Sequence, residues 1–216
     1  MCFSTSASFG AGAVLAVIGV VTIKKAKEPN QILFAGIPFL FSLQQIDEGF
    51  LWLALTNNYS AAMKEITTYI FLFIAQVIWP LLVPLSISLL EKNGKRKIFL
   101  QVLVFVGAII SVYLTYCLIN YPVNSKIIGY HISYSQNYPA SLSIIGGILY
   151  VLATVFPPLI SSFKRMWYLG LSILISYIMT RIFYTDYIVS VWCFFASVIS
   201  ISVYAVMTDI NNTKTA

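Results

Sequence analysis

Long apolar segments separated by short polar turns are the feature that most constrains this 216-residue chain. Several of them run for about 20 residues, the length that an α-helix needs to cross the ~30 Å hydrocarbon core of a bilayer. Backbone N–H and C=O groups find no water at that depth, so a spanning segment must satisfy them within its own helix. The sequence therefore predicts an all-α, polytopic membrane protein.

Composition supports this fold class. Hydrophobic residues make up 59% of the chain and charged residues 9%, whereas soluble domains carry about 45–50% apolar and about 25% charged residues. A soluble globular domain and a disordered chain are both excluded. The net charge is +6, but the basic residues lie between the apolar segments instead of forming one basic face, so we expect no nucleic-acid partner.

The apolar pattern predicts a single domain over residues 1–216, built as a bundle of seven transmembrane helices. The longest link between them covers residues 120–139. The first ten residues contain no Lys or Arg, so we expect no cleavable signal peptide. The predicted helices cover residues 8–23, 31–55, 65–90, 98–119, 140–162, 166–184 and 187–208.

The basic residues predict the orientation of this bundle, because cytoplasmic loops carry an excess of Lys and Arg. Three of the thirteen fall on one side: Lys64, Lys126 and Arg181. This split places the N-terminus and the 120–139 link outside and the C-terminus in the cytoplasm. The other ten lie on the opposite side: Lys24, Lys25, Lys27, Lys92, Lys95, Arg96, Lys97, Lys164, Arg165 and Lys214.

Two acidic residues interrupt the second predicted helix, within Gln44-Gln45-Ile46-Asp47-Glu48-Gly49. Glu48 precedes Leu55 by seven residues, which places it ~10 Å below the outer end of the helix. An ionisable group at that depth is costly and marks a candidate functional site. The alternative is an acid that structural hydrogen bonds satisfy, or one that burial keeps protonated.

Arg181 lies near the outer end of the sixth predicted helix, one turn after Tyr177. A guanidinium group suits either a counter-charge for Glu48 or Asp47 or a clamp for an anionic group; the alternative is an Arg that extends to the outer surface. We predict a pocket that opens outward and binds a small ligand or a lipid headgroup. Its predicted lining is Gln44, Glu48, Trp52, Gln76, Tyr177 and Arg181.

A metal site is a further hypothesis. Cys2, Glu48 and His131 lie on the same predicted side, and a single divalent ion such as zinc accepts this ligand set. With one histidine in the chain, a three-His zinc site is excluded. The alternative for His131 is packing among the tyrosines of its own segment.

Three function classes stay open at this point. A binding or sensing protein needs only the one-sided pocket. A transporter of a small solute or ion also needs a path to the cytoplasm, and a membrane-embedded hydrolase, metal-dependent or not, needs a base beside a nucleophile or an activated water. Nothing in the sequence specifies an oligomeric state, and the lipid bilayer is the one partner that the composition itself predicts.

Four short motifs resemble an uncharacterised family of bacterial integral-membrane proteins. They are the opening Met-Cys-Phe-Ser-x-x-Ala-Ser-Phe-Gly, the Gln-Gln-x-x-Glu-Gly of residues 44–49, the Gly-Tyr-His of 129–131 and the Val-Trp-Cys-Phe-Phe-Ala of 191–196. The resemblance covers most of the chain. It implies a multi-pass protein of the bacterial inner membrane, and it supplies no activity and no catalytic residues.

The predicted orientation can be tested with reporter fusions. A reporter fused at Asn93 or at Asn212 is expected to report a cytoplasmic location, and one fused at Asn58 an external location. The reason is the distribution of positive charge between the two sets of links. A cytoplasmic signal at Asn58 would contradict the orientation.

Overall fold

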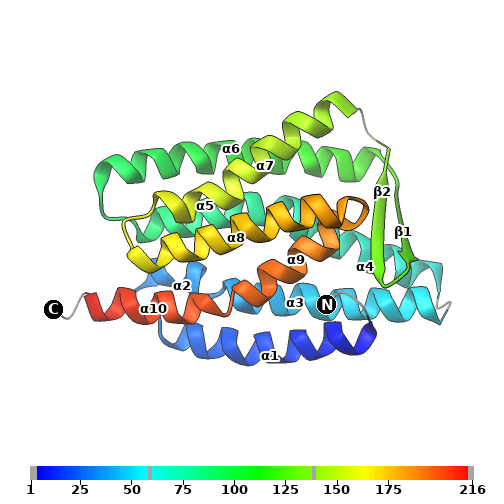
Figure 1. The fold of residues 1–216 in the computed structure, drawn as a ribbon, viewed down its shortest axis with the longest axis horizontal. Coiled ribbons are helices and arrows are strands. Elements are labelled where there is room, and N and C mark those ends of the chain that lie inside the picture. The colour runs from blue at the N-terminus through cyan, green and yellow to red at the C-terminus, as the bar shows by residue number, and fades with distance from the viewer. Residues whose placement is uncertain (1–3, 58–59, 138–139, 214–216) are drawn as a thin grey trace.

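A computed structural model describes residues 4–57, 60–137 and 140–213, with only the backbone described for 140–143 and 213. This part of the chain is helical apart from one β-hairpin, and the helices lie roughly along one axis (Figure 1). The α-helices are α1 (Thr5–Lys24), α2 (Pro29–Ala35), α3 (Ile37–Thr56), α4 (Ala61–Leu72), α5 (Trp79–Leu90), α6 (Gly94–Asn120), α7 (Ala140–Ile160), α8 (Lys164–Phe183), α9 (Ile188–Ile199) and α10 (Ser202–Thr213), with a π-helical segment η1 (Phe73–Ile78) and a 3₁₀ turn η2 (Thr185–Tyr187) between them.

Three of the predicted helices are divided in the structure. The predicted helix 31–55 becomes α2 and α3, because Gly36 and Pro38 stand at the junction and Pro38 has no N–H to donate. The predicted helix 65–90 becomes α4, η1 and α5. The predicted helix 187–208 becomes α9 and α10, where the Ser200 hydroxyl bonds back to the Ser197 carbonyl at 2.6 Å, an arrangement that bends helices.

Five helical segments are long and apolar enough to cross a membrane, which indicates a membrane protein. Of the other two predicted spans, α3 carries polar residues that lower its mean hydropathy, and the described apolar part of α7 covers only Ile144–Ile160. The five segments are Thr5–Lys24, Ala61–Leu90, Gly94–Asn120, Lys164–Phe183 and Thr185–Asn212.

Helices α5 and α6 pack at very short range. Pro84 has no N–H, so the carbonyl oxygen of Pro80 lacks its usual helical donor. Gly107 of α6 faces this carbonyl, and a Cβ atom on Gly107 would lie 1.9 Å from the Pro80 oxygen. The absence of a side chain at Gly107 is therefore what allows the two backbones to meet.

The link 120–139, expected as a loop, contains an antiparallel hairpin of β1 (Val123–Ile128) and β2 (His131–Gln136). Gly129, at φ +61°, begins its tight turn in the left-handed region that glycine adopts freely. Ile132 is fully buried against Leu51 and Trp52 of α3. The hairpin thus closes one end of the helical bundle (Figure 1).

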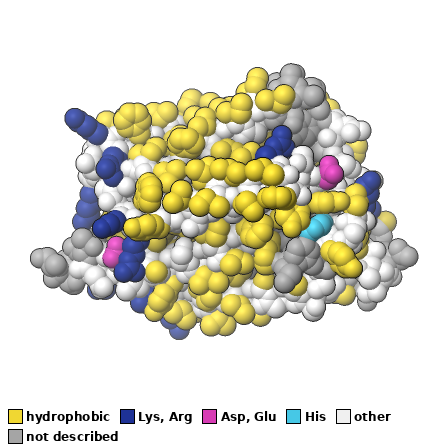
Figure 2. Space-filling view, viewed as in Figure 1, with side chains coloured by type: hydrophobic (Ala, Val, Ile, Leu, Met, Phe, Trp, Pro, Cys, Tyr) yellow, Lys and Arg dark blue, Asp and Glu magenta, His cyan; other side chains and the backbone are white. Residues whose placement is uncertain are grey.

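The opposite end of the bundle carries most of the positive charge. Lys and Arg side chains gather there, around the end of α10, and only a few lie near the hairpin (Figure 2). The turns that follow α1, α5 and α7 meet at this end (Figure 1). The structure therefore places the basic links together at one end of the bundle, as the charge pattern predicts (Figure 2).

Glu91 joins two of these turns. Its carboxylate is 2% exposed; Oε1 accepts from the Ser162 hydroxyl at 2.7 Å and the Asn93 N–H at 2.9 Å, and Oε2 accepts from the Ser162 N–H at 2.8 Å. Arg96 donates to the adjacent Ser161 carbonyl at 2.8 Å. Burial raises the pKa of Glu91, but the hydrogen bonds from Ser162, Asn93 and Lys92 outweigh it and hold the pKa below its usual value.

Replacing Glu91 is expected to destabilise the protein in a pH-dependent way. Glu91→Gln should lower the free energy of unfolding at neutral pH by about 1–3 kcal/mol, because charge-assisted hydrogen bonds are lost. Because the pKa of Glu91 in the native state is lower than its unfolded value of 4.5, the ionised carboxylate stabilises the fold above pH 4.5. The difference in free energy of unfolding between wild type and Glu91→Gln should therefore vanish as the pH falls through the native pKa. Denaturation in detergent at several pH values measures this, with exposed Glu65→Gln as control; a pH-independent difference would contradict it.

Candidate functional site

The backbone of the α4–α5 segment is irregular at η1. In this π-helical stretch the Trp79 N–H donates to the Ile74 carbonyl, five residues back. The next carbonyl, that of Ala75, would need the N–H of Pro80, which does not exist. The Tyr150 hydroxyl of α7 donates to the Ala75 carbonyl instead. π-Helical segments are frequent at functional sites, and irregular backbone at membrane depth is tolerated where it is buried or lines a cavity.

Glu48 is fully buried on the face of α3 that meets α9. The Ser190 hydroxyl donates to Glu48 Oε1 at 2.7 Å, and Gln45 Nε2 donates to Oε2 at 3.4 Å. The carboxyl group therefore connects two helices that are 142 residues apart in sequence. This is the structural hydrogen bonding that the sequence left open as the alternative for Glu48, and it also holds α9 in place.

A second polar contact links α3 to α5. The indole N–H of Trp79 donates to Gln44 Oε1 at 2.8 Å, and Phe41 stacks on the Trp79 ring with a centroid distance of 4.0 Å. Both Gln44 and Trp79 are buried. The polar residues of α3 thus face the inside of the bundle, as their helical spacing predicts.

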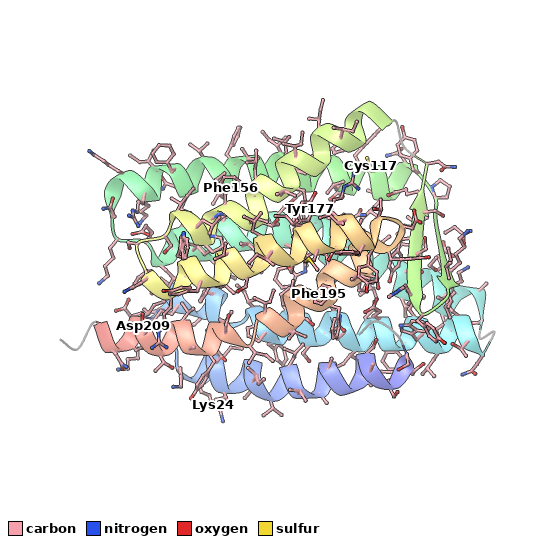
Figure 3. All side chains as sticks on the ribbon, viewed as in Figure 1. Lys24, Cys117, Phe156, Tyr177, Phe195 and Asp209 are labelled. Carbon is pink, nitrogen blue, oxygen red and sulfur yellow. The ribbon has the colours of Figure 1, made fainter. Side chains whose placement is uncertain are left out.

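A cavity of about 630 Å³ lies between η1, α6, α7, α8 and α9. Helices α7 and α8, which flank it, diverge toward the hairpin end (Figure 1). Most of its lining is apolar, from Ala75, Leu114, Ile148 and similar side chains. Tyr177 comes from α8 beside α7 (Figure 3). The side chains with polar atoms that line it are Gln76, Tyr113, Tyr150, Tyr177, Arg181 and Trp192.

Some of the polar groups that line this cavity have no hydrogen-bond partner or counter-charge within the described part of the protein. In the described part of the chain, Gln76 Oε1 and Trp192 Nε1 are buried and have no hydrogen-bond partner. The one salt bridge recorded among the described residues joins Arg165 to Asp209 at 3.3 Å, so no described carboxylate pairs with Arg181. A positive charge and two unpaired polar atoms therefore line the same space, and they suit an anionic or polar ligand.

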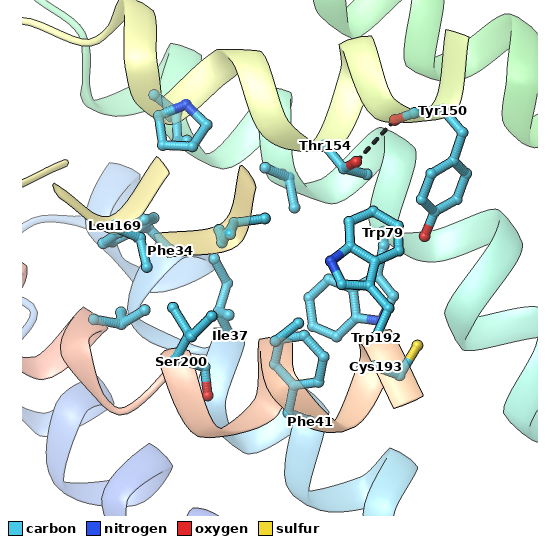
Figure 4. Close-up of a pocket in the computed structure, with 17 residues that line it drawn as sticks. Phe34, Ile37, Phe41, Trp79, Tyr150, Thr154, Leu169, Trp192, Cys193 and Ser200 are labelled. Atoms are coloured by element: carbon cyan, nitrogen blue, oxygen red, sulfur yellow. Dashed lines mark hydrogen bonds between the residues drawn. The ribbon is translucent and has the colours of Figure 1, made fainter. Parts of the chain in front are cut away.

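A smaller cavity of about 70 Å³ lies deeper in the bundle, between α2, α3, α5, α7, α8, α9 and α10 (Figure 4). Its lining is almost entirely apolar and includes Phe34, Phe41, Leu169 and Ile173. Tyr150, Trp192 and Cys193 line both cavities. These three side chains form the layer that separates the two spaces, and we call them the shared wall.

The structure divides the six residues of the predicted pocket among three places. Gln76, Tyr177 and Arg181 line the larger cavity together. Gln44 and Glu48 are buried behind it, in contacts with Trp79 and Ser190. Trp52 packs under the hairpin against Ile132. Ligand binding by these six residues stays a prediction.

The metal hypothesis also stays a prediction. Cys2 lies outside the described residues, and no group of three His, Cys, Asp or Glu side chains within the described ranges could hold an ion. His131 begins β2 and stacks on Tyr187 with a centroid distance of 4.9 Å, while Tyr184 meets it edge-on at 5.3 Å. Burial lowers the pKa of His131 below its ordinary value.

Several residues of the site carry weak sequence signals. Tyr150 and Tyr113 lie in apolar helices where a tyrosine is unremarkable. Ser190 belongs to a small-residue seam on the seventh predicted helix, which by itself indicates packing. Trp192 lies in the Val-Trp-Cys-Phe-Phe-Ala motif of residues 191–196, and that motif is the signal that could have pointed to the shared wall.

A family of unknown function (DUF6629) matches residues 1–216, which is the whole chain. The chain belongs to this family. No curated protein and no solved structure shows a significant match. Membership of the DUF6629 family agrees with the resemblance to an uncharacterised family and supplies no substrate, so the function has to be argued from the cavity and from the buried contacts around it.

Two substitutions of Glu48 should separate the contribution of side-chain shape to stability from the contribution of hydrogen bonding. Glu48→Gln keeps an acceptor for Ser190 and is expected to leave the unfolding temperature nearly unchanged. Glu48→Leu leaves the buried Ser190 hydroxyl and Gln45 amide without this partner and should cost about 1–3 kcal/mol. Thermal unfolding in detergent measures both, with exposed Glu65→Leu as the matched control; equal stability of the two Glu48 variants would contradict the structural role.

Proposed function

We propose that the protein is a seven-span protein of the bacterial inner membrane that binds a small anionic ligand or lipid headgroup from the outer side. The observation that carries this proposal is the larger cavity, in which Arg181, Gln76 and Tyr177 line one space. The role is binding or sensing. The proposed topology has the N-terminus outside and the C-terminus in the cytoplasm, and it is supported by the separation of basic residues between the two ends (Figure 2).

Arg181 is the proposed anion-binding group. Its guanidinium donates several hydrogen bonds in a fixed plane and stays charged at every physiological pH. Tyr177, one helical turn earlier, lines the same cavity and can add a hydroxyl donor to an oxyanion. Gln76 brings an amide group from the opposite side, on η1.

Glu48 acts behind the cavity in this proposal. Through Ser190 it fixes α9 against α3, and α9 carries Ile188, Val189 and Trp192 of the cavity lining. The charge of Glu48 would reach an anion in the cavity only across this helix. Glu48 is therefore a positioning residue, and Arg181 is the group that touches the ligand.

Transport of a small solute is the second candidate. The observation that favours it is the irregular η1 segment, which lines the larger cavity through Ala75 and Gln76. Discontinuous helices at membrane depth are typical of transporter binding sites. A transporter would also need a polar path beyond the shared wall, and the smaller cavity on that side is apolar.

Binding of an anionic ligand can be tested with purified protein in nanodiscs of phosphatidylcholine. Added phosphatidylglycerol, or inorganic phosphate in a separate arm, should raise the unfolding temperature of wild type, and native mass spectrometry should show retained phosphatidylglycerol. Arg181→Gln should weaken binding roughly tenfold or more, because a charge-assisted contact is worth about 1.5–3 kcal/mol.

Lys126→Gln is the matched control, since Lys126 is an exposed cation of β1 outside the cavity. It should bind as wild type does. The phosphate arm separates a free anion from a lipid headgroup, because only a lipid site prefers phosphatidylglycerol over inorganic phosphate. Equal binding by wild type and Arg181→Gln in both arms would overturn the proposal.

A further inference from the structure

The two cavities of the bundle differ in chemistry and are separated by one layer of side chains. The larger cavity carries Arg181 and unpaired polar atoms, whereas the smaller one is apolar. Tyr150, Trp192 and Cys193 contribute to both linings. A charged space that adjoins an apolar one is complementary to an amphiphile with an anionic head and an aliphatic chain.

Apart from the Trp192 indole N–H, the hydroxyl and indole groups around the smaller cavity form hydrogen bonds within the protein. The Thr154 hydroxyl donates to the Tyr150 carbonyl at 2.8 Å (Figure 4), and the Ser200 hydroxyl donates to the Ser197 carbonyl at 2.6 Å. The Tyr150 hydroxyl donates to Ala75, and the Trp79 indole to Gln44. A bound water needs two to four polar partners, so this cavity favours an apolar occupant over water.

The size of the smaller cavity fits the end of a hydrocarbon chain. One water-sized group needs about 10–15 Å³ by the same measure of volume. A volume of about 70 Å³ therefore accepts about five to seven such groups, which corresponds to a short run of methylene groups. The flat ring system of a sterol would not fit there without displacing helices.

Trp192 belongs to the shared wall and lines both cavities. Its ring is held edge-on by Tyr177 at 5.0 Å and by Tyr150 at 5.6 Å between ring centroids. Its indole N–H has no hydrogen-bond partner among the described residues. Rotation of this side chain would therefore break ring contacts but no hydrogen bond within the described structure.

We infer that the ligand of the larger cavity is a straight-chain anionic amphiphile whose chain passes Trp192 and ends in the smaller cavity. This inference rests on the proposed function, because Arg181 supplies the charge that binds the head. The aliphatic chain of the ligand contributes to the selectivity of binding. The shared wall sets the point at which this aliphatic chain turns into the smaller cavity.

Photo-crosslinking tests where the chain lies. A dodecanoate with a diazirine at its chain end is added to the protein in phosphatidylcholine nanodiscs, and labelled residues are identified by mass spectrometry. We expect labels on Ile173, Ile199 and Val203 of the smaller cavity, in excess over lipid-facing Val17 and Ile109. Unlabelled dodecanoate should compete, and uncharged dodecanol should compete at least tenfold more weakly.

Two variants and one matched control variant make the test specific. Ala196→Phe places a ring in the smaller cavity, which Ala196 lines, and should abolish the labels while phosphate binding persists. Arg181→Gln should reduce the labels about tenfold. Ile109→Phe, a matched change on the lipid-facing side of α6, should leave them unchanged.

The outcomes separate this inference from the proposed function. If phosphate or phosphatidylglycerol binds through Arg181 but only lipid-facing residues are labelled, the chain site is wrong and the headgroup site stands. If no anion binds and no cavity residue is labelled, both are wrong. Labels that are equal in wild type and Arg181→Gln would also overturn the inference, because the chain would then enter independently of the anionic head.

Discussion

One missing N–H group organises the centre of this protein. Pro80 cannot donate to the Ala75 carbonyl, and a carbonyl left unpaired at membrane depth would cost several kcal/mol. The chain meets this requirement by placing Tyr150 of α7 against Ala75, and a second carbonyl of η1, that of Val77, accepts from Ser111 of α6 at 2.7 Å. Two neighbouring helices are therefore fixed around η1, and the larger cavity is the space that this arrangement leaves beside it.

The contacts of α3 show how an acid can be both buried and useful. Glu48 carries the polar contact between α3 and α9, and Gln44 carries the contact between α3 and α5. Neither residue reaches the lining of the larger cavity, yet both determine where α9 and Trp79 lie. Such contacts select one helix arrangement among many apolar ones, because lipid and protein interior are equally apolar and give little direction to packing.

The sequence predicted the membrane class, the helical segments and the inward direction of Gln44 and Glu48, because hydrophobic length and helical period are local properties. It also placed Gln76, Tyr177 and Arg181 in one predicted pocket, and these three residues line the larger cavity. The divisions of three helices were only partly visible: Pro38 and Pro80 mark two of them, but the serine-rich junction of α9 and α10 has no proline. The hairpin was missed because its strands are short and owe their stability to burial of Ile132 under distant helices.

Partner choice among buried polar groups could not be predicted for a different reason. Glu48 had Arg181 as the obvious opposite charge, but the structure gives it Ser190 instead. Helical period tells which face a residue occupies, and it does not tell which neighbouring helix that face meets. Glu91 shows the same limit at the other end of the bundle, where its partners Ser161 and Ser162 lie 70 and 71 residues further along the chain.

The position of the hairpin has a consequence for the order of assembly. Its strands contact α3 through Ile132, α4 through a 2.8 Å hydrogen bond between Ser125 and Thr68, and the α8–α9 turn through Ser133 and the Asp186 carbonyl. Membrane helices form individually before they associate, but this surface exists only after helices from both halves of the chain have met. The hairpin therefore docks only after α3, α4 and the α8–α9 turn have come together, and its docking reports that these parts of the bundle are in place.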